Sequence, residues 1–321
     1  MLVTLGMPAS AKPRLPWLAQ ARGAEFGLKP ALSGKTTLED GHYQYAVKAG
    51  TSIEDGIVVV NFSDKPITLR LYAADVVTPR GGGVAPVDPG QRMKSVGAWV
   101  QLERSDVEVP GKDQVFVGFA VRVPDALSPG DHLGAIVASR DGEPTPGGIS
   151  VEQRVALITR VRIPGTPSLK TEIGPVHVAS RGRSRIFRVE LRNVGNLLFT
   201  AKGTVDVTEG GERVASIPLT PSEVYLIPKG KSTFIARWDD PPLFGSRRAV
   251  ASFDTRAAGV PFRRISSMPV AVKLVSWLWL IMIACVFIGI GALIALTRLR
   301  PRPRRMATTA YQARGRERSL T

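Results

Sequence analysis

Alternating apolar and polar residues dominate the chain between positions 26 and 272. Short segments of this kind recur, separated by Gly, Pro, Asp and Ser, and none has a sustained helical period. The clearest, Val115–Val123, places an apolar residue at every second position. Strands are predicted at Tyr43–Val47, Ser52–Asn61, Ile67–Val76, Ala98–Leu102, Val115–Val123, Leu133–Ser139 and Val151–Ile163, then at Leu169–Val178, Arg185–Asn193, Leu198–Val207, Glu212–Leu219, Ser232–Trp238, Arg248–Thr255 and Arg264–Val272.

The predicted strands fall into two similar groups. Several short strands with turn residues between them are typical of an immunoglobulin-like β-sandwich, here twice over. The groups meet at Ile163–Pro167, a turn-forming stretch too short for a flexible tether. We therefore expect an all-β protein with two tandem, stacked sandwiches, at 24–163 and 164–273. In each group an asparagine, Asn61 or Asn193, ends a strand before turn residues, which predicts a corner there.

A long apolar segment follows the second group of strands. Val275–Leu296 contains no charged residue, and a helix of this length extends for about 33 Å, enough to cross a hydrocarbon core of about 30 Å. Trp277 and Trp279 lie near one end, where indoles favour the membrane interface. A buried core helix would not need an uninterrupted apolar run of this length. We expect a single transmembrane helix at 274–297.

The residues on either side predict the orientation of that helix. A basic tail at 298–321 begins with five arginines, at Arg298, Arg300, Arg302, Arg304 and Arg305. Positive residues favour the cytoplasmic side, so we expect a single-pass plasma-membrane protein with its sandwiches exposed outside. Residues 1–23 combine a short apolar stretch with small residues at 9–11, which resembles part of a signal peptide. We expect Met1 to lie inside a longer signal peptide whose true start is upstream.

Charge and composition narrow the possible partners. The 321 residues include 43 Lys+Arg and 27 Asp+Glu, a formal charge of +16, of which +7 follows Leu274. The charge of the tail is thus explained by its role in orienting the membrane helix. The remaining +9 lies in the part of the chain before Leu274 and favours anionic wall polymers over nucleic acid as partners. The only cysteine, Cys285, lies in the apolar segment, which excludes an internal disulfide and Cys-based zinc sites. Three widely spaced histidines predict no metal site, and we expect no cofactor.

Few residues point to catalysis. Gly27–Thr36 ends in Gly-Lys-Thr, but six residues rather than four separate its glycines, so we expect a turn before the first strand instead of a phosphate loop. Asp131 and His132 form the only adjacent acid–histidine pair, and either a general acid or a turn-stabilising carboxylate fits them. Trp99 could fill a core or stack on a sugar. We expect no catalytic residue, and Trp99, Asp131 and His132 are candidates for ligand contact or structure.

Several segments together resemble a known family. They are Phe26–Ala31, Val58–Pro66, Ala98–Val100, Val107–Pro110, Phe119–Pro124 and Pro129–Ile136. With a second sandwich and a C-terminal helix with a basic tail, they resemble the WxL-interacting protein family of Gram-positive cell surfaces. The resemblance implies a peptidoglycan-binding first domain and a second domain that engages partner proteins. The second sandwich, with Leu191–Asn196, resembles generic immunoglobulin-like modules, and the high Ala, Val and Arg content indicates an actinobacterial source.

These features predict a non-catalytic, single-pass cell-envelope protein. Its extracellular sandwiches are expected to bind cell-wall polymer, a surface protein, or both. A structural or adaptor subunit of a membrane complex is the first alternative, and an accessory protein of a glycan-processing system is the second. A hydrolase acting through Asp131 and His132 is a further alternative that mutation of the two residues would test.

Overall fold

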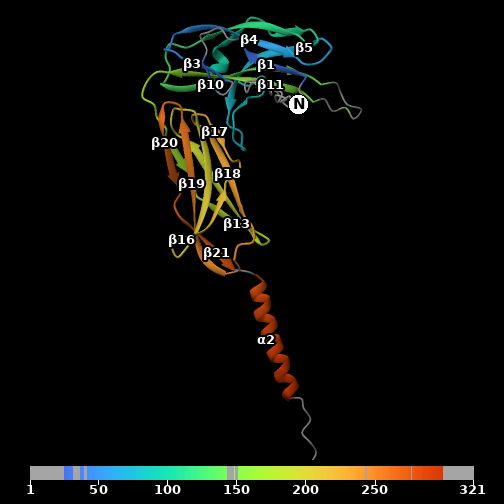
Figure 1. Ribbon diagram of the computed structural model, residues 1–321, viewed down its shortest axis with the longest axis vertical. Coiled ribbons are helices and arrows are strands. Elements are labelled where there is room, and N and C mark those ends of the chain that lie inside the picture. Colours follow the sequence, from blue (N-terminus) through green and yellow to red (C-terminus); the bar gives the residue numbers. More distant parts are fainter. Residues whose placement is uncertain are drawn as a thin grey trace, which may run out of the picture. The chain divides into compact units, whose positions relative to one another are not determined.

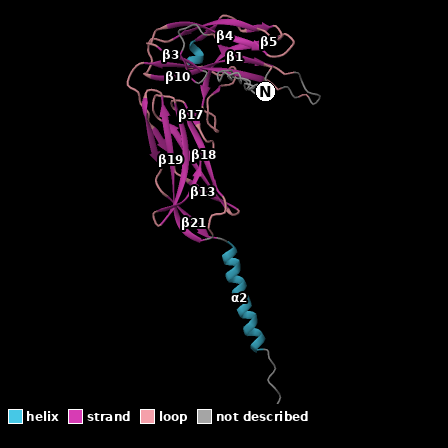
Figure 2. Ribbon diagram, viewed as in Figure 1, coloured by secondary structure: helices cyan, strands magenta, loops and turns pink. Residues whose placement is uncertain are grey.

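The computed structural model describes residues 25–31, 37–39, 42–142, 148, 151–242, 244–275 and 277–298. These residues form strands for the most part, with one long helix at the C-terminal end (Figures 1 and 2). The expectation of a mostly β protein is confirmed for this part of the chain. The leader at 1–23 and the tail arginines from Arg300 to Arg305 lie outside the described residues.

The first sandwich packs two sheets around one apolar core. One sheet has the order β1 (Phe26–Pro30), β4 (Ser52–Asn61), β9 (Gln114–Arg122), β7 (Val100–Leu102). The other has the order β2 (Thr37–Glu39), β3 (His42–Ala46), β11 (Gln153–Ile163), β10 (Gly130–Arg140), β5 (Ile67–Val77), β6 (Ala85–Pro86), and β8 (Asp106–Val109) also pairs with β5. Among the described strands of this sandwich, the pairs are antiparallel except for β3 with β11. The core between the sheets includes the fully buried Phe26, Leu28, Tyr43, Ile57, Leu69 and Ile136.

The second sandwich repeats this construction with its own core. In one sheet β14 (Ser184–Asn193) pairs with β12 (Thr171–Ile173), β13 (His177–Arg181) and β18 (Lys231–Trp238). In the other, β15 (Phe199–Glu209) pairs with β16 (Glu212–Pro218), β17 (Val224–Leu226) and β19 (Phe244–Ala257), and β19 also pairs with β20 (Val260–Ser266) and β21 (Val270–Val275). The core joins the sheets through Phe234 and Phe253, whose ring centroids are 5.0 Å apart.

Proline divides two of the predicted strands. Leu169–Val178 was expected as one strand, but Pro175 separates β12 from β13. Pro269 likewise lies between β20 and β21 within the predicted strand Arg264–Val272. Proline has no N–H to donate to a sheet ladder, so pairing stops at these positions.

The prediction of a turn over Gly27–Thr36 is wrong for its first four residues. Gly27 to Pro30 belong to β1 and pair with β4, Gly27 opposite Val60 and Pro30 opposite Ile57. Pro30 is tolerated because it ends a strand at the edge of its sheet. The Gly-Lys-Thr residues lie outside the described residues.

Trp99 was predicted in a strand over Ala98–Leu102, and this is also wrong. A helical turn, α1 (Val96–Trp99), precedes β7. The Asp75 carboxylate on β5 stabilises this helical turn, because the carboxylate accepts hydrogen bonds from the backbone N–H groups of Ser95 at 3.0 Å and Gly97 at 2.9 Å. The turn places Trp99 in the core of the first sandwich, where its side chain is 6% exposed. Of the two roles considered for Trp99, core filling and stacking on a sugar, this position matches core filling.

The two asparagine corners are built alike. The Asn61 Nδ2 donates to the carbonyls of Lys65 at 2.8 Å and Val109 at 3.0 Å, and its Oδ1 accepts from the N–H of Ser63. The Asn193 Nδ2 donates to the carbonyls of Leu197 at 2.8 Å and Leu226 at 3.0 Å, and its Oδ1 accepts from the N–H of Gly195. Each amide therefore ties the end of a strand in one sheet to the facing sheet.

We expect Asn193→Ala to lower the free energy of unfolding by about 3 kcal/mol, because it leaves buried carbonyls without donors. Asn61→Ala should have a similar effect on the first sandwich, since both asparagines are 1% exposed. Chemical denaturation of the full chain in detergent measures the change, with the exposed Gln101→Ala on β7 as control. A loss no larger than that of the control would contradict the structural role of the corners.

The last element is α2 (Trp277–Arg298), a helix of 22 residues. It starts later than the expected 274, because Leu274 and Val275 belong to β21 and Leu274 is only 2% exposed. Apolar side chains of its described part are exposed, for example Phe287 at 69% and Ile288 at 70%. Within the described residues, no helix combines the length and apolarity required to cross a membrane.

Candidate functional site

The structure brings two of the three candidate residues together. The rings of Trp99 and His132 lie 5.3 Å apart, and the His132 Nε2 is 2.9 Å from the carbonyl oxygen of Ser128. Asp131 precedes His132 on β10, where neighbouring side chains point to opposite faces of the sheet. Its carboxylate bonds to other residues, so the two side chains do not form the acid–base pair that a hydrolase would use.

Asp131 instead links the first sandwich to the second. Its fully buried carboxylate accepts two hydrogen bonds from the Arg162 guanidinium, at 2.6 and 2.9 Å. It also accepts the backbone N–H of Leu198 at 2.8 Å, while Arg162 donates to the carbonyl of Ala258 at 3.1 Å. A bidentate, charge-assisted pair of this kind fixes both partners in position.

Apolar and backbone contacts surround this ion pair. Leu133, Ala135, Val137 and Ile158 on the outer face of β10 and β11 pack with Leu198 and Ile227 of the second sandwich. A Cβ on Gly130 would meet the carbonyl oxygen of Asn196 at 2.4 Å, so the backbones approach closely there. The Asn196 side chain donates to the carbonyls of Pro129 and Thr166, both at 3.1 Å. The two sandwiches thus form one compact unit.

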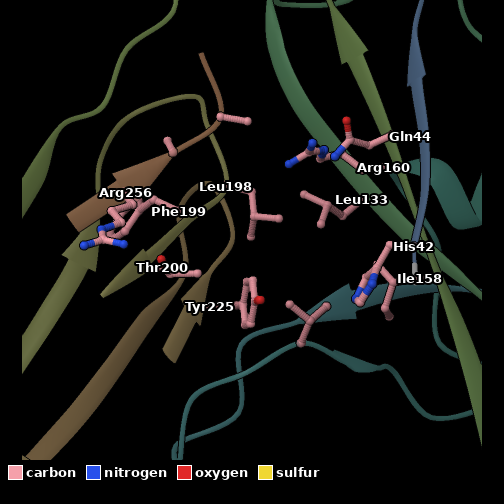
Figure 3. A pocket seen from close by; sticks show the side chains of 13 residues that line it. His42, Gln44, Leu133, Ile158, Arg160, Leu198, Phe199, Thr200, Tyr225 and Arg256 are labelled. Carbon is pink, nitrogen blue, oxygen red and sulfur yellow. The ribbon is translucent and has the colours of Figure 1, made fainter. Parts of the chain in front are cut away.

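A cavity of about 300 Å³ lies beside these contacts, with walls from both sandwiches (Figure 3). The first sandwich contributes β3, β10 and β11, and the second contributes β15, β17 and the end of β19. The lining residues are His42, Gln44, Val84, Leu133, Ile158, Arg160, Leu198, Phe199, Thr200, Tyr225, Arg256, Ala257 and Ala258.

Strand alternation explains why polar side chains reach this cavity. On β3 the buried Tyr43 and Tyr45 point into the first core, so His42 and Gln44 point to the outer face. Because β3 is parallel to β11, with Thr159 opposite Tyr43, the side chains of Ile158 and Arg160 emerge on the same outer face. Figure 3 shows Arg160 beside Gln44, with His42 next to Ile158.

The cavity is cationic with an apolar wall. Arg160 is 7% exposed, and Arg256 on the opposite wall has its guanidinium carbon 5.7 Å from the ring centroid of Phe262. Arginine stays charged at all physiological pH values. None of the described lining residues is Asp or Glu, and Leu133, Leu198 and Phe199 supply an apolar surface. The arrangement fits a carboxylate or phosphate group carried on a larger molecule.

Sequence reasoning did not select Arg160 or Arg256. The available signal was the β11 segment, where Arg160 and Arg162 alternate with apolar residues inside an otherwise hydrophobic strand. An arginine at such a position faces either solvent or another domain. Among the described residues, no group of three or more His, Cys, Asp or Glu side chains could hold a metal ion.

Comparison with known proteins finds only distant structural neighbours. No family model matches the chain, and no curated protein is similar to it in sequence. A chaperone–tip adhesin complex of CFA/I fimbriae is 11% identical with a TM-score of 0.40, covering 77% of this chain and 100% of its own. The Pseudomonas aeruginosa CupB2 chaperone is 11% identical with a TM-score of 0.36, covering 73% and 97%. A PapD-like domain of human CEP192 is 9% identical with a TM-score of 0.28, covering 51% and 99%. At these values the function has to be argued from the geometry of the chain itself.

Proposed function

We propose that the chain is a non-catalytic binding protein of the cell envelope that holds an acidic group of a wall polymer between its two sandwiches. The observation that carries the proposal is the cavity walled by Arg160 and Arg256, with no carboxylate among its described lining residues. Both arginines are in the part of the chain whose charge, +9, opposes that of anionic wall polymers.

The fixed arrangement of the sandwiches supports this use of the cavity. Its two walls come from different sandwiches, so a ligand between them benefits from walls that are already in position. The Asp131–Arg162 pair and the apolar contacts around Leu198 supply that pre-organisation. A site formed before the ligand arrives avoids the entropic cost of ordering it.

The location that we propose is argued from α2 and the residues on either side of it. We propose that the uncharged segment Val275–Leu296, which supplies most of α2, anchors the chain in the plasma membrane as a single pass. This proposal rests on the sequence, because no helix of the described residues meets the requirement by itself. The arginines beyond it would then be cytoplasmic and the sandwiches would face the wall. The resemblance to WxL-interacting proteins supports the same placement, because the first domain of that family is described as peptidoglycan-binding.

An adaptor role is the second candidate, and one feature of the first sandwich favours it. Phe116 on β9 is 56% exposed on the outer face of its sheet. Its ring covers Gly56 on β4, where a Cβ would lie 2.2 Å from the ring edge. Exposed aromatic side chains of this kind are enriched at protein–protein interfaces. A stoichiometric protein that co-purifies from detergent and is lost with Phe116→Ser would favour the adaptor.

Co-sedimentation of the full chain with purified actinobacterial cell walls tests wall binding. We expect retention on untreated walls at low salt, because the attraction is electrostatic, and release at high salt, because exposed charges are screened within about 10 Å. Walls stripped of their phosphate-containing polymers by acid serve as the control and should retain little protein. Absence of retention at low salt would contradict the proposal.

A further inference from the structure

A second cavity, of about 470 Å³, lies at another end of the second sandwich. The β15–β16 hairpin, the first residues of β19 and the start of β21 form its walls, and β16 and β21 lie at the same end of this sandwich in Figure 1. Its lining residues are Thr208, Gly210, Gly211, Ser246, Arg247, Arg248 and Ala271. None of them is part of the cavity around Arg160.

Two consecutive arginines of β19 line this cavity, and strand alternation directs Arg247 toward the interior and Arg248 toward solvent. The Arg247 side chain is 7% exposed, and its Nη2 donates to the Glu209 carboxylate at 2.7 Å, which orients the guanidinium. Arg248 is exposed, and no carboxylate of the described residues forms an ion pair with it. Glu209 pairs with Arg247, so the Arg248 guanidinium is the remaining positive charge at this cavity, and none of the lining residues is an acid.

The remaining lining residues offer small, neutral hydrogen-bond donors. Ser246 has an exposed hydroxyl group that can donate to a ligand, whereas the Thr208 Oγ1 donates to the carbonyl oxygen of Arg248 at 3.4 Å. Gly210 and Gly211 form the hairpin turn with φ values of 61° and 96°. A Cβ on either glycine would meet nothing within 4 Å, so the turn backbone is open to a ligand. Arginine forks, hydroxyls and turn N–H groups are the donors that phosphate oxygens bind.

We propose that this cavity binds a phosphate group. We further propose that the phosphate belongs to the headgroup of an anionic phospholipid, and this second step rests on the membrane anchor proposed above. Ala271 is six residues from Trp277, the first residue of α2, so the intervening chain spans at most about 20 Å. If α2 enters the bilayer, this length of chain is short enough to allow the cavity to reach the headgroup layer. The site would hold the second sandwich against the membrane surface.

Titration of the full chain in detergent with glycerol 3-phosphate tests the phosphate site without a lipid. Arg248→Gln should weaken binding at least tenfold, because it removes an exposed guanidinium and no core contact. Arg247→Gln should weaken binding as well, but it also breaks the ion pair with Glu209, so Arg248→Gln is the decisive variant. All variants are made in the Arg160→Gln/Arg256→Gln background, which removes the phosphate site proposed between the sandwiches. The control is Arg188→Gln, an exposed arginine on the outer face of β14, which should bind as the background does. Equal binding by this background and by its Arg248→Gln variant, or no binding by the background, would overturn the second site.

Nanodiscs identify the source of the phosphate. We expect the full chain to unfold at a higher temperature in phosphatidylglycerol discs than in phosphatidylcholine discs, and Arg248→Gln to remove most of that difference. Glycerol 3-phosphate binding without a preference for phosphatidylglycerol would support the site and overturn the lipid as its ligand. Failure of the chain to enter either disc would contradict the membrane anchor and the lipid source, and the titration would still decide the phosphate site.

Discussion

Asp131→Ala should destabilise the two-sandwich unit by about 2–4 kcal/mol. The substitution removes the buried acceptor of two Arg162 hydrogen bonds and leaves the N–H of Leu198 without its carboxylate. Breaking a buried ion pair on one side costs about 3–5 kcal/mol, and the 28% exposure of the Arg162 side chain lowers that cost through solvation. The effect should extend beyond stability, because the same atoms join the sandwiches.

Two measurements on the full chain in detergent separate these consequences. Chemical denaturation gives the change in unfolding free energy, and limited proteolysis at the Ile163–Pro167 linker reports loosening of the sandwiches. Asp64→Ala is the matched control, since Asp64 is 89% exposed and its pairing with Lys112 at 3.4 Å should contribute less than about 1 kcal/mol. If Asp131→Ala matches Asp64→Ala in both assays, Asp131 does not join the sandwiches.

The second large effect concerns the cavity itself. Replacing both Arg160 and Arg256 by glutamine should reduce binding of an acidic polymer at least a hundredfold. A hydrogen bond to a charged group contributes about 1.5–3 kcal/mol, and loss of 1.4 kcal/mol is a tenfold change in Kd. Each single variant should lose about tenfold or more. Arg188→Gln, on the outer face of β14, removes the same charge away from the cavity and should leave Kd within about twofold.

Most of the fold could be predicted from local pattern, because one face of each long strand is buried. β4 has the bounds predicted for it, Ser52–Asn61, and β5 and β14 differ by one residue at one end. The errors occur where a distant residue decides the local structure. The α1 turn at Trp99 depends on Asp75, more than 20 positions earlier, which no local pattern around Trp99 records.

The site was harder to predict for a related reason. Asp131 was selected as a residue that could bond backbone N–H groups, and it does bond that of Leu198. Its partners Arg162 and Leu198 belong to different sandwiches, and only the packing of the two brings them together. The cavity arginines come from β11 and β19, nearly a hundred positions apart, so periodicity alone gives no reason to pair them.

Isothermal titration of the full chain with glycerol phosphate oligomers, the repeating unit of an acidic wall polymer, tests the central claim most directly. We predict saturable binding by the wild type and weaker binding by each of the single variants Arg160→Gln and Arg256→Gln. The double variant should bind most weakly, and Arg188→Gln should bind with the affinity of the wild type. Unfolding midpoints measured on the same samples separate loss of binding from loss of fold. Equal affinity of the chain with the wild-type cavity and a stably folded double variant, both carrying Arg248→Gln to remove the second phosphate site, would contradict the proposal that the cavity between the sandwiches is the binding site.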